Sequence, residues 1–296
     1  MISNLTKFKV NGEKIYVPRD IGFEEKNHQL TLTMKQGGID ANMQENRASF
    51  EAWALLGKSK GYKKVILKLE DNIQIDKEKH YNRFLYRVYN FDKLFDWFTI
   101  SPKLEKEVKK FIKNLGEKDL YYNVPDSDAK GNPTHKEAIM EEHFTTDTKD
   151  ANEKLHLKVK KYYSQLPVGL FDGKPTNNSR IFTGGKSAID FWGITGNTLN
   201  VVELKAGKNK SLGVLSELFF YTCLMRDIHI RKIANPRYKD SKYRGFDELM
   251  KTDIKQVKGH ILTEQEHSQI KYAYEELKKA NEKDKTICFA DKICKY

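Results

Sequence analysis

The chain has 296 residues and a formal net charge of +12, a length that suits one large domain or two small ones with a sizeable core. The basic excess favours a polyanionic partner such as nucleic acid. Its three cysteines form no Cys-x-x-Cys pair, its start carries no apolar secretion signal, and no apolar run approaches a membrane span. The composition therefore argues against a disulfide framework, a cysteine zinc site and a membrane protein, and predicts a cytoplasmic protein.

Residues 1–100 are predicted to form a small α/β accessory domain. Asn11-Gly12 is a turn signal between two strands, and Asp40 is a candidate helix cap. The sequence does not disclose the role of this domain, which could carry a protein partner or a second copy of the chain. The expected elements are strands at 7–10, 13–17, 30–34 and 65–67 and helices at 41–57 and 78–98.

Aromatic side chains recur at helical spacing through 78–98 and interleave with Arg83 and Arg87. Such side chains could stack on bases, but a stripe of this kind is typical of a helix face buried in a core, and we expect a core. A basic helix at 103–114 and a loop at 123–133 make 101–136 a helix and linker.

The second half, 137–296, alternates strands and helices in a way that predicts an α/β sheet with helices on both faces. The expected elements are a helix at 150–165 that ends before Pro167, a strand at 180–182, a hairpin at 187–205, a helix at 212–228, a strand at 257–262, a helix at 263–282 and a strand at 286–290.

The hairpin at 187–205 forces two acids together. A two-residue turn at Gly196-Asn197 would place Asp190 directly across from Glu203, with Cβ atoms roughly 4.5–5.5 Å apart, where like charges repel. Lys205 leaves the same face of its strand as Glu203. Two acids held together beside a lysine indicate a divalent cation between them.

The flanking residues support this interpretation, because they can bury the opposite face of the sheet. The alternative is an exposed hairpin that carries an ordinary ion pair, since Glu-x-Lys alone is common. The matched aspartate, the turn and the apolar flanks together favour the metal site. The flanking residues are Ile189, Phe191, Val202 and Leu204.

Asp190 followed by Glu203-x-Lys205 on the next strand resembles the PD-(D/E)xK nuclease superfamily, over about residues 137 to 291. The resemblance implies a restriction-endonuclease-like mixed sheet flanked by helices. It also implies a Mg²⁺ ion, with Mn²⁺ as a substitute, held by Asp190, Glu203 and the carbonyl of Leu204. Lys205 would then orient the attacking water or offset charge on the phosphate.

The helix at 212–228 is similar to the Gly-x3-Gln-x3-Tyr helix of the RecB-like branch. Gly213, Glu217 and Tyr221 share its face, with Glu in place of Gln. A glutamate on so apolar a helix needs a partner. Glu217 could bind Lys205 or a metal-bound water, or form a structural salt bridge. Because Gly213 has no side chain, a backbone or ligand can approach this face.

Another acid is expected from the helix at 150–165, where the family often places a helical glutamate. Glu153 is favoured as the residue that holds a metal-bound water, although an acid near a helix start can simply complement the helix dipole. The rivals are Glu137, Glu141 and Glu142.

Basic and aromatic residues near this site are candidates for nucleic-acid contact, because cations bind phosphates and tyrosines stack on bases. An ordinary solvated loop is the alternative. The candidates are Lys186, Lys208, Lys210, Tyr221, Arg237, Tyr238, Lys239, Lys242, Tyr243 and Arg244.

The sequence thus predicts a Mg²⁺-dependent nuclease that hydrolyses phosphodiester bonds, with restriction or phage defence as a fitting role. By analogy with the family, the resemblance favours DNA over RNA as the predicted substrate. The alternatives are a non-catalytic nucleic-acid-binding or scaffold protein that keeps the fold, or an RNase.

Overall fold

A computed structural model describes residues 7–10, 13–75, 79–128, 135–182, 187–206, 211–238, 240–265 and 268–296, with side-chain burial from Tyr16 onward. The chain divides into two compact units, described separately below. The first unit comprises Met1–Glu117, Lys210–Glu217 and His267–Lys283. The second unit comprises Lys118–Asn209, Leu218–Glu266 and Asp284–Tyr296. This division differs from the expected domains because the first unit also takes in the basic helix after residue 100 and two later segments.

The sheet of the first unit has four strands in the order β3-β4-β5-β6, and a separate hairpin, β1–β2, precedes it. Strand β3 was not expected from the sequence. It joins β4 antiparallel through Asn27 and His28, whose φ angles of 49° and 59° suit a tight hairpin turn. The strands are β1 Lys7–Val10, β2 Glu13–Tyr16, β3 Ile21–Lys26, β4 Gln29–Met34, β5 Lys64–Leu69 and β6 Phe98–Ile100.

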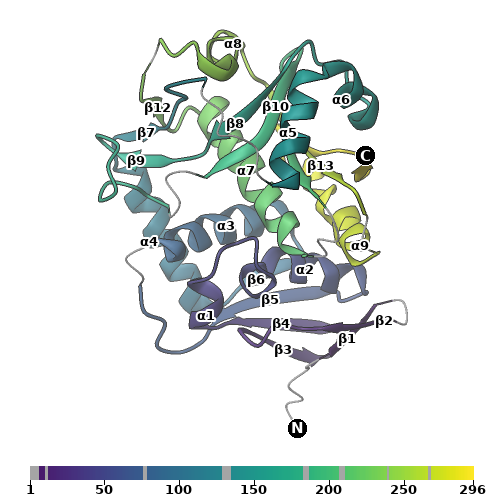
Figure 1. Cartoon of the computed structure of the whole chain (residues 1–296). Coiled ribbons are helices and arrows are strands. Elements are labelled where there is room, and N and C mark those ends of the chain that lie inside the picture. The colour runs from purple at the N-terminus through teal and green to yellow at the C-terminus, as the bar shows by residue number, and fades with distance from the viewer. Residues whose placement is uncertain are drawn as a thin grey trace. The chain divides into compact units, whose positions relative to one another are not determined.

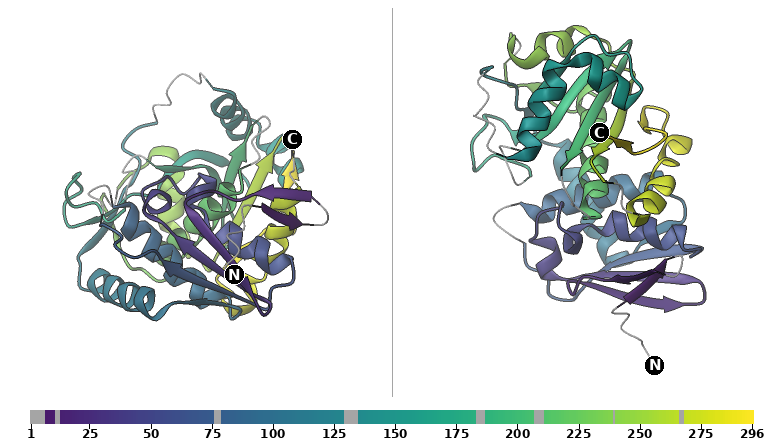
Figure 2. Two further views of the ribbon diagram at one scale, coloured as in Figure 1. Left: turned by 90° about the horizontal axis from the view of Figure 1, so that it is seen from below. Right: turned by 45° about the vertical axis from the view of Figure 1, so that its right-hand side comes forward.

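Burial alternates along β4 and β5, so one face of this sheet is covered and the other is partly exposed. Helices of this unit lie on one side of its strands (Figure 2). They are α1 Gln36–Ile39, η1 Asn46–Ala48, α2 Phe50–Ser59, α3 His80–Leu94, α4 Pro102–Gly116, α9 Ser268–Leu277 and α10 Ala280–Lys283. The start of α7 also belongs to this unit.

The aromatic stripe of α3 is core, as predicted. Phe50 of α2 packs edge-on against Phe84 and Phe91, with ring centroids 5.5 and 5.8 Å apart. Arg83 and Arg87 are buried as well, which removes them from the surface. The interleaved cations therefore serve the interior of this unit.

Two helix limits in the first unit were predicted wrongly. Asp40 does not cap a helix at 41–57, because it follows α1, and α2 begins only after Ser49. The second helix ends at Leu94, and Phe98 starts β6. In contrast, Ser101 caps α4 as its Ser-Pro start suggests, with the hydroxyl accepting from the backbone N–H of Leu104.

The main sheet of the second unit has the strand order β14-β13-β11-β10-β8, and β15 also pairs with β13. Strands β8, β10 and β11 are antiparallel, whereas β13 runs parallel to β11. The strands are β8 Tyr162–Pro167, β10 Ala188–Thr195, β11 Thr198–Lys205, β13 Gln256–Thr263, β14 Ile287–Phe289 and β15 Cys294–Lys295. A smaller sheet joins β7 Leu120–Tyr122, β9 Leu170–Asp172 and β12 Asn235–Pro236.

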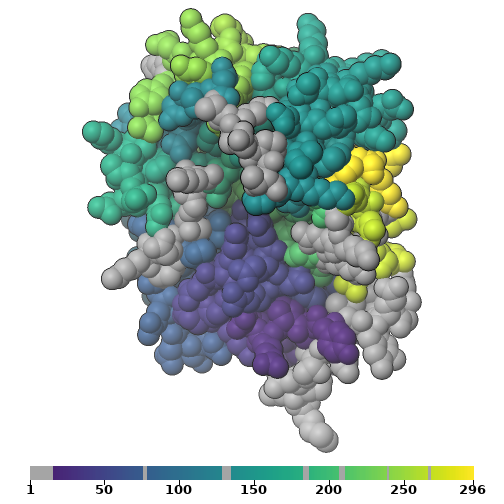
Figure 3. Space-filling model, viewed as in Figure 1, coloured from purple at the N-terminus to yellow at the C-terminus, as the bar shows by residue number. Residues whose placement is uncertain are grey.

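Helices cover both faces of the main sheet (Figure 1). Helices α5, Lys136–Thr146, and α6, Thr148–Leu155, bury Phe191, Val202 and Leu204 in one cluster. The outer sides of α5 and α6 form part of the molecular surface, shown in teal at the upper right of Figure 3. Helix α7, Gly213–His229, crosses the other face, where a Cβ on Gly259 would lie 2.7 Å from the hydroxyl of Thr222. The unit is completed by η2, Tyr243–Gly245, and α8, Phe246–Lys251. The fold is therefore mixed α/β, with mixed sheets flanked by helices.

Two elements of this half were predicted wrongly. No helix spans 150–165: α6 ends at Leu155, where His156 adopts φ 54°, and β8 follows with alternating burial. The expected strand at 180–182 contributes only an isolated bridge from Arg180 to Phe171. Among the described helices, none is both long and apolar enough to cross a membrane.

Candidate active site

The hairpin of β10 and β11 has the predicted turn and register. Its ladder runs from Thr195 opposite Thr198 to Phe191 opposite Val202, around Gly196 with φ 58°. The next residues outward are Asp190 and Glu203. The register thus directs these two acids to the same face at the open end of the hairpin.

Asp190 lies against the backbone of β11. Its Oδ2 accepts a hydrogen bond of 2.8 Å from the backbone N–H of Leu204. Because the N–H and C=O of one residue in an antiparallel strand leave the same edge, the carbonyl of Leu204 also leaves toward β10. The carboxylate of Asp190 and this carbonyl therefore share one edge of the strand.

Glu203 and Lys205 form an ion pair at the end of β11. The Nζ of Lys205 lies 2.5 Å from Oε1 of Glu203, and the two side chains are 13% and 2% exposed. Residues two apart in a strand share a face, which brings the ammonium to the same face as both acids. A buried carboxylate is thereby matched by a nearby cation, as burial of charge requires.

Of the four helical glutamates considered from the sequence, Glu137 reaches the hairpin. Its Oε1, in the first turn of α5, accepts a hydrogen bond of 3.1 Å from the backbone N–H of Ala206. Glu141 accepts from the amide of Gln165 at 2.7 Å. Glu153 and Glu142 are exposed, and Glu153 lies in the second half of the short helix α6, not near a helix start.

Three residues that the sequence did not single out also gather at this edge. Glu264 follows β13, and its backbone N–H donates to the carbonyl of Lys205 at 3.3 Å. Lys136 forms an ion pair with Glu264. The hydroxyl of Tyr296 donates to the Lys205 carbonyl at 3.5 Å. Burial, followed by Glu264 and Glu137, raises the pKa of Tyr296 to about 12, so this phenol stays protonated at neutral pH.

A signal for Glu264 was present in the sequence. Strands β11 and β13 are parallel, with Lys205 beside Thr263, and the carboxyl ends of parallel neighbours meet at one edge of a sheet. Tyr296 and Glu137 had no comparable signal, because their approach depends on how the C-terminal segment and α5 pack.

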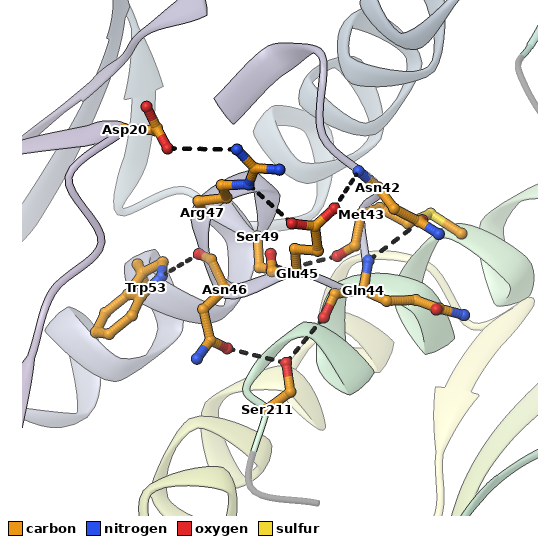
Figure 4. Close-up of polar contacts among 10 residues, drawn as sticks. All are labelled: Asp20, Asn42, Met43, Gln44, Glu45, Asn46, Arg47, Ser49, Trp53 and Ser211. Carbon is orange, nitrogen blue, oxygen red and sulfur yellow. Dashed lines mark hydrogen bonds and ion pairs between the residues drawn. The ribbon is translucent and has the colours of Figure 1, made fainter. Parts of the chain in front are cut away.

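Glu217, in the first-unit part of α7, is 1% exposed and accepts a hydrogen bond from the side-chain amide of Gln44. A Cβ on Gly213 would collide with the backbone of Gln44, which confirms that a backbone approaches this face. The same loop holds the start of the helix, because Asn46 accepts from the backbone N–H of Leu212 at 2.9 Å. Ser211 in turn donates to the carbonyl of Gln44 at 2.8 Å (Figure 4).

The residues expected to contact nucleic acid have different environments. Lys186, Lys208, Lys210 and Lys239 lie outside the described residues. Arg237 and Tyr238 are exposed and stack on each other, 4.8 Å from guanidinium carbon to ring centroid.

Lys242 and Tyr243 are exposed. Arg244 is held internally, with its Nε donating to the carbonyl of Ser127 at 3.1 Å. Tyr221 is 3% exposed and packs beside Phe220, which places it in the interior. Among the candidates that the structure describes, two cations and two tyrosines are therefore exposed.

The donors at the hairpin end are all oxygen atoms. Asp190 and Glu203 supply carboxylates, and Leu204 supplies a carbonyl. In the described parts of the chain, no group of three or more His, Cys, Asp or Glu residues is arranged to hold a metal. Mg²⁺ takes hard oxygen ligands and is commonly held by one or two carboxylates, with water and substrate phosphate completing its shell. The residues present fit Mg²⁺ and are a poor match for a soft metal.

No family model, curated protein or solved structure matches the chain.

Proposed function

We propose that the chain is a Mg²⁺-dependent nuclease of the PD-(D/E)xK class that hydrolyses phosphodiester bonds in DNA. The observation that carries the proposal is the meeting of Asp190, Glu203 and Lys205 at one end of the β10–β11 hairpin. Asp190 is bonded to the Leu204 backbone at 2.8 Å, and Lys205 is paired with Glu203 at 2.5 Å. A core ion pair would not require the second acid opposite.

The order of elements in the second unit supports the restriction-endonuclease-like fold. A helix precedes an antiparallel hairpin whose adjacent strands carry the acids, and a further helix and a parallel strand follow. From the hairpin onward these elements follow the order expected for the nuclease core from the sequence, whereas the helix predicted at 150–165 ends at Leu155. Helices cover both faces of the sheet, so the two acids lie at the end of well-packed strands. Rigid elements of this kind hold functional side chains in precise positions.

Asp190, Glu203 and the carbonyl of Leu204 would hold the cation. When bound, Mg²⁺ would polarise a phosphate oxygen and lower the pKa of a water nucleophile. Asp190 contributes its charge while its bond to Leu204 fixes the rotamer. Glu203 contributes a second charge and holds Lys205 at the same edge.

Lys205 is placed to offset negative charge that develops on the scissile phosphate. Preorganised cations of this kind act most strongly in a site that excludes water, and Lys205 is mostly buried. Glu137 fixes the backbone of Ala206, directly after Lys205, and is therefore favoured over Glu153 as the helical acid of the site.

The test is incubation of the purified chain with supercoiled plasmid, linear duplex, single-stranded DNA and RNA, each with Mg²⁺ or with EDTA. We expect Mg²⁺-dependent cleavage of DNA, and little cleavage by Lys205→Ala although that variant still binds DNA. Cleavage of RNA alone would make the enzyme an RNase. Binding without cleavage of any substrate would contradict the nuclease and favour the scaffold alternative.

A further inference from the structure

Helix α4 of the first unit presents one strongly basic face. Its fifteen residues, Pro102–Gly116, contain five lysines and two glutamates. Leu104, Val108 and Leu115 are its buried residues. At about 100° per residue, the lysines fall within an arc of about 120° centred opposite this buried stripe. The lysines are Lys103, Lys106, Lys109, Lys110 and Lys113.

The acidic residues of α4 flank this arc and interact with the neighbouring helix. Glu107 interacts electrostatically with Tyr81, and Glu105 interacts electrostatically with Asp92. Tyr81 and Asp92 are both residues of α3. Glu105 also pairs with Lys109 at 2.5 Å. The acids are therefore directed to the sides of the helix, and the outward face is left to the lysines.

Three of the lysines stand out from others on the surface. Lys106, Lys110 and Lys113 are exposed, and no carboxylate of the described residues forms an ion pair with them. By contrast, lysines in and near α9 and α10 are paired: Lys278 with Glu275 at 2.7 Å and Lys279 with Glu276 at 2.9 Å. A row of like charges at one-turn spacing is destabilising in an isolated helix.

The spacing of the three lysines fits a phosphate backbone. Residues 106 to 113 span about 10 Å along the helix axis, close to three steps of about 3.4 Å along one DNA strand. The face has no aromatic or aliphatic side chain for insertion into lipid, since no residue of α4 is among the exposed large apolar side chains. Helices that lie in a membrane interface need such a face.

We propose that the outward face of α4 is a binding surface for the phosphate backbone of duplex DNA, with Lys106, Lys110 and Lys113 as its contacts. The choice of DNA rests on the proposed function, but the binding itself requires neither metal nor cleavage. The surface reads no sequence, because phosphate contacts carry none. It would add affinity and hold substrate on the first unit.

The test measures binding of a labelled short duplex by fluorescence anisotropy in EDTA, across a salt series. The variant is Lys106→Gln/Lys110→Gln/Lys113→Gln, because Gln has nearly the helix propensity of Lys. A matched control, Lys278→Gln/Lys279→Gln/Lys283→Gln, removes the same charge from lysines that are already paired. Circular dichroism checks that each variant is folded.

We expect the α4 variant to bind at least about tenfold more weakly and to lose up to about 0.9 units of salt slope per contact, roughly 2.7 in all. The control should stay close to wild type. Replacement of the same three α4 residues by arginine should retain binding, since the charge is kept.

Equal curves for the α4 variant and wild type would overturn the proposal, as would equal losses in the α4 variant and the control. Lysine-dependent binding to anionic vesicles without binding to DNA would also overturn it. Lysine-dependent DNA binding by a chain that cleaves nothing with Mg²⁺ would support this surface and contradict only the nuclease.

Discussion

Two glutamates, Glu51 in the first unit and Glu203 in the second, are almost fully buried beside a cation, but their surroundings differ. Glu51 receives two hydrogen bonds of 2.6 Å from Arg87 and one of 2.9 Å from Ser216. Glu203 pairs with the ammonium of Lys205 at a strand end, with Asp190 on the adjacent strand. The Glu51–Arg87 pair is closed and lies inside a core. The Glu203–Lys205 pair lies at the end of a strand beside Asp190, and we call these three residues the charged rim.

We expect this difference to separate a structural ion pair from one that serves catalysis. A guanidinium matches a carboxylate with two parallel bonds and fixes both groups. An ammonium is a point charge on a flexible stem, so it can shift when substrate or metal arrives. A second acid nearby adds repulsion that serves no core. We therefore expect the Glu51 site to govern stability and the Glu203 site to govern activity.

The largest expected effect is on stability at the closed pair. Arg87→Met leaves Glu51 buried without its cation and should lower the free energy of unfolding by about 3–5 kcal/mol. Urea unfolding measures this, and Arg87→Met/Glu51→Leu should recover most of the loss because it removes both charges. An unchanged midpoint for Arg87→Met would show that the pair is not structural, and the comparison would fail.

The next effect is metal binding at the rim. Mg²⁺ at about 100 times its Kd should stabilise wild type by about 2.7 kcal/mol, measured by thermal unfolding with and without Mg²⁺. Asp190→Asn keeps an oxygen for the Leu204 N–H but loses the charge, so it should lose most of the Mg²⁺-induced shift. Without metal it should be at least as stable as wild type. An equal shift in both proteins would remove Asp190 from the metal site.

The next prediction is that acid lowers the stability of the second unit through its buried histidines. Burial, then Lys258, lowers the pKa of His260 to about 3 from an ordinary value of 6.5. The folded state keeps this imidazole neutral while the unfolded state protonates below 6.5, so its contribution is present above pH 6.5 and is lost as pH falls toward 3. The loss at about pH 5 should be roughly 2 kcal/mol.

The comparison is between wild type and His260→Gln. The Nε2 of His260 lies 3.0 Å from Oδ1 of Asn200, and a glutamine amide can replace this hydrogen bond. Urea unfolding between neutral pH and about pH 5 should show a smaller loss of stability in the variant. Burial also lowers the pKa of His229 to about 3, so His229 should behave in the same way. Both histidines belong to the second unit. Parallel pH curves for wild type and His260→Gln would refute the assignment.

The smallest effect distinguishes two helical acids. Glu137→Ala removes the acceptor of the Ala206 N–H and should slow cleavage about tenfold, as loss of a supporting hydrogen bond at a metal site does. Glu153→Ala changes an exposed residue and should cleave at the wild-type rate. Single-turnover rates on the same duplex measure both. A slow Glu153 variant beside a normal Glu137 variant would restore the acid first favoured from the sequence.

The hairpin could be predicted from sequence because its information is local. Gly196-Asn197 sets the turn, and the alternation of apolar residues sets the face, so the register followed without knowledge of the fold. The helix predicted at 150–165 failed because Pro167 was read as a helix stop. In fact His156 ends the helix, and Tyr162, Ser164 and Leu166 bury alternate positions of a strand.

The partners of the site depended on packing between distant segments. Glu137 reaches Ala206 across 69 residues and Gln44 reaches Glu217 across 173. Nothing in the local pattern ranks Glu137 above Glu153, because both are acids on short helices. The buried state of Glu217 was predictable from its apolar helix, but the identity of its partner, an amide from the N-terminal region, was not.

The most direct test of the central claim is the rate of plasmid cleavage with Mg²⁺ by wild type, Asp190→Asn, Glu203→Gln and the exposed control Glu282→Gln. The account predicts that the two rim variants are folded and at least about 100-fold slower than wild type, while Glu282→Gln and wild type cleave alike. Wild-type rates for folded Asp190→Asn and Glu203→Gln would contradict it.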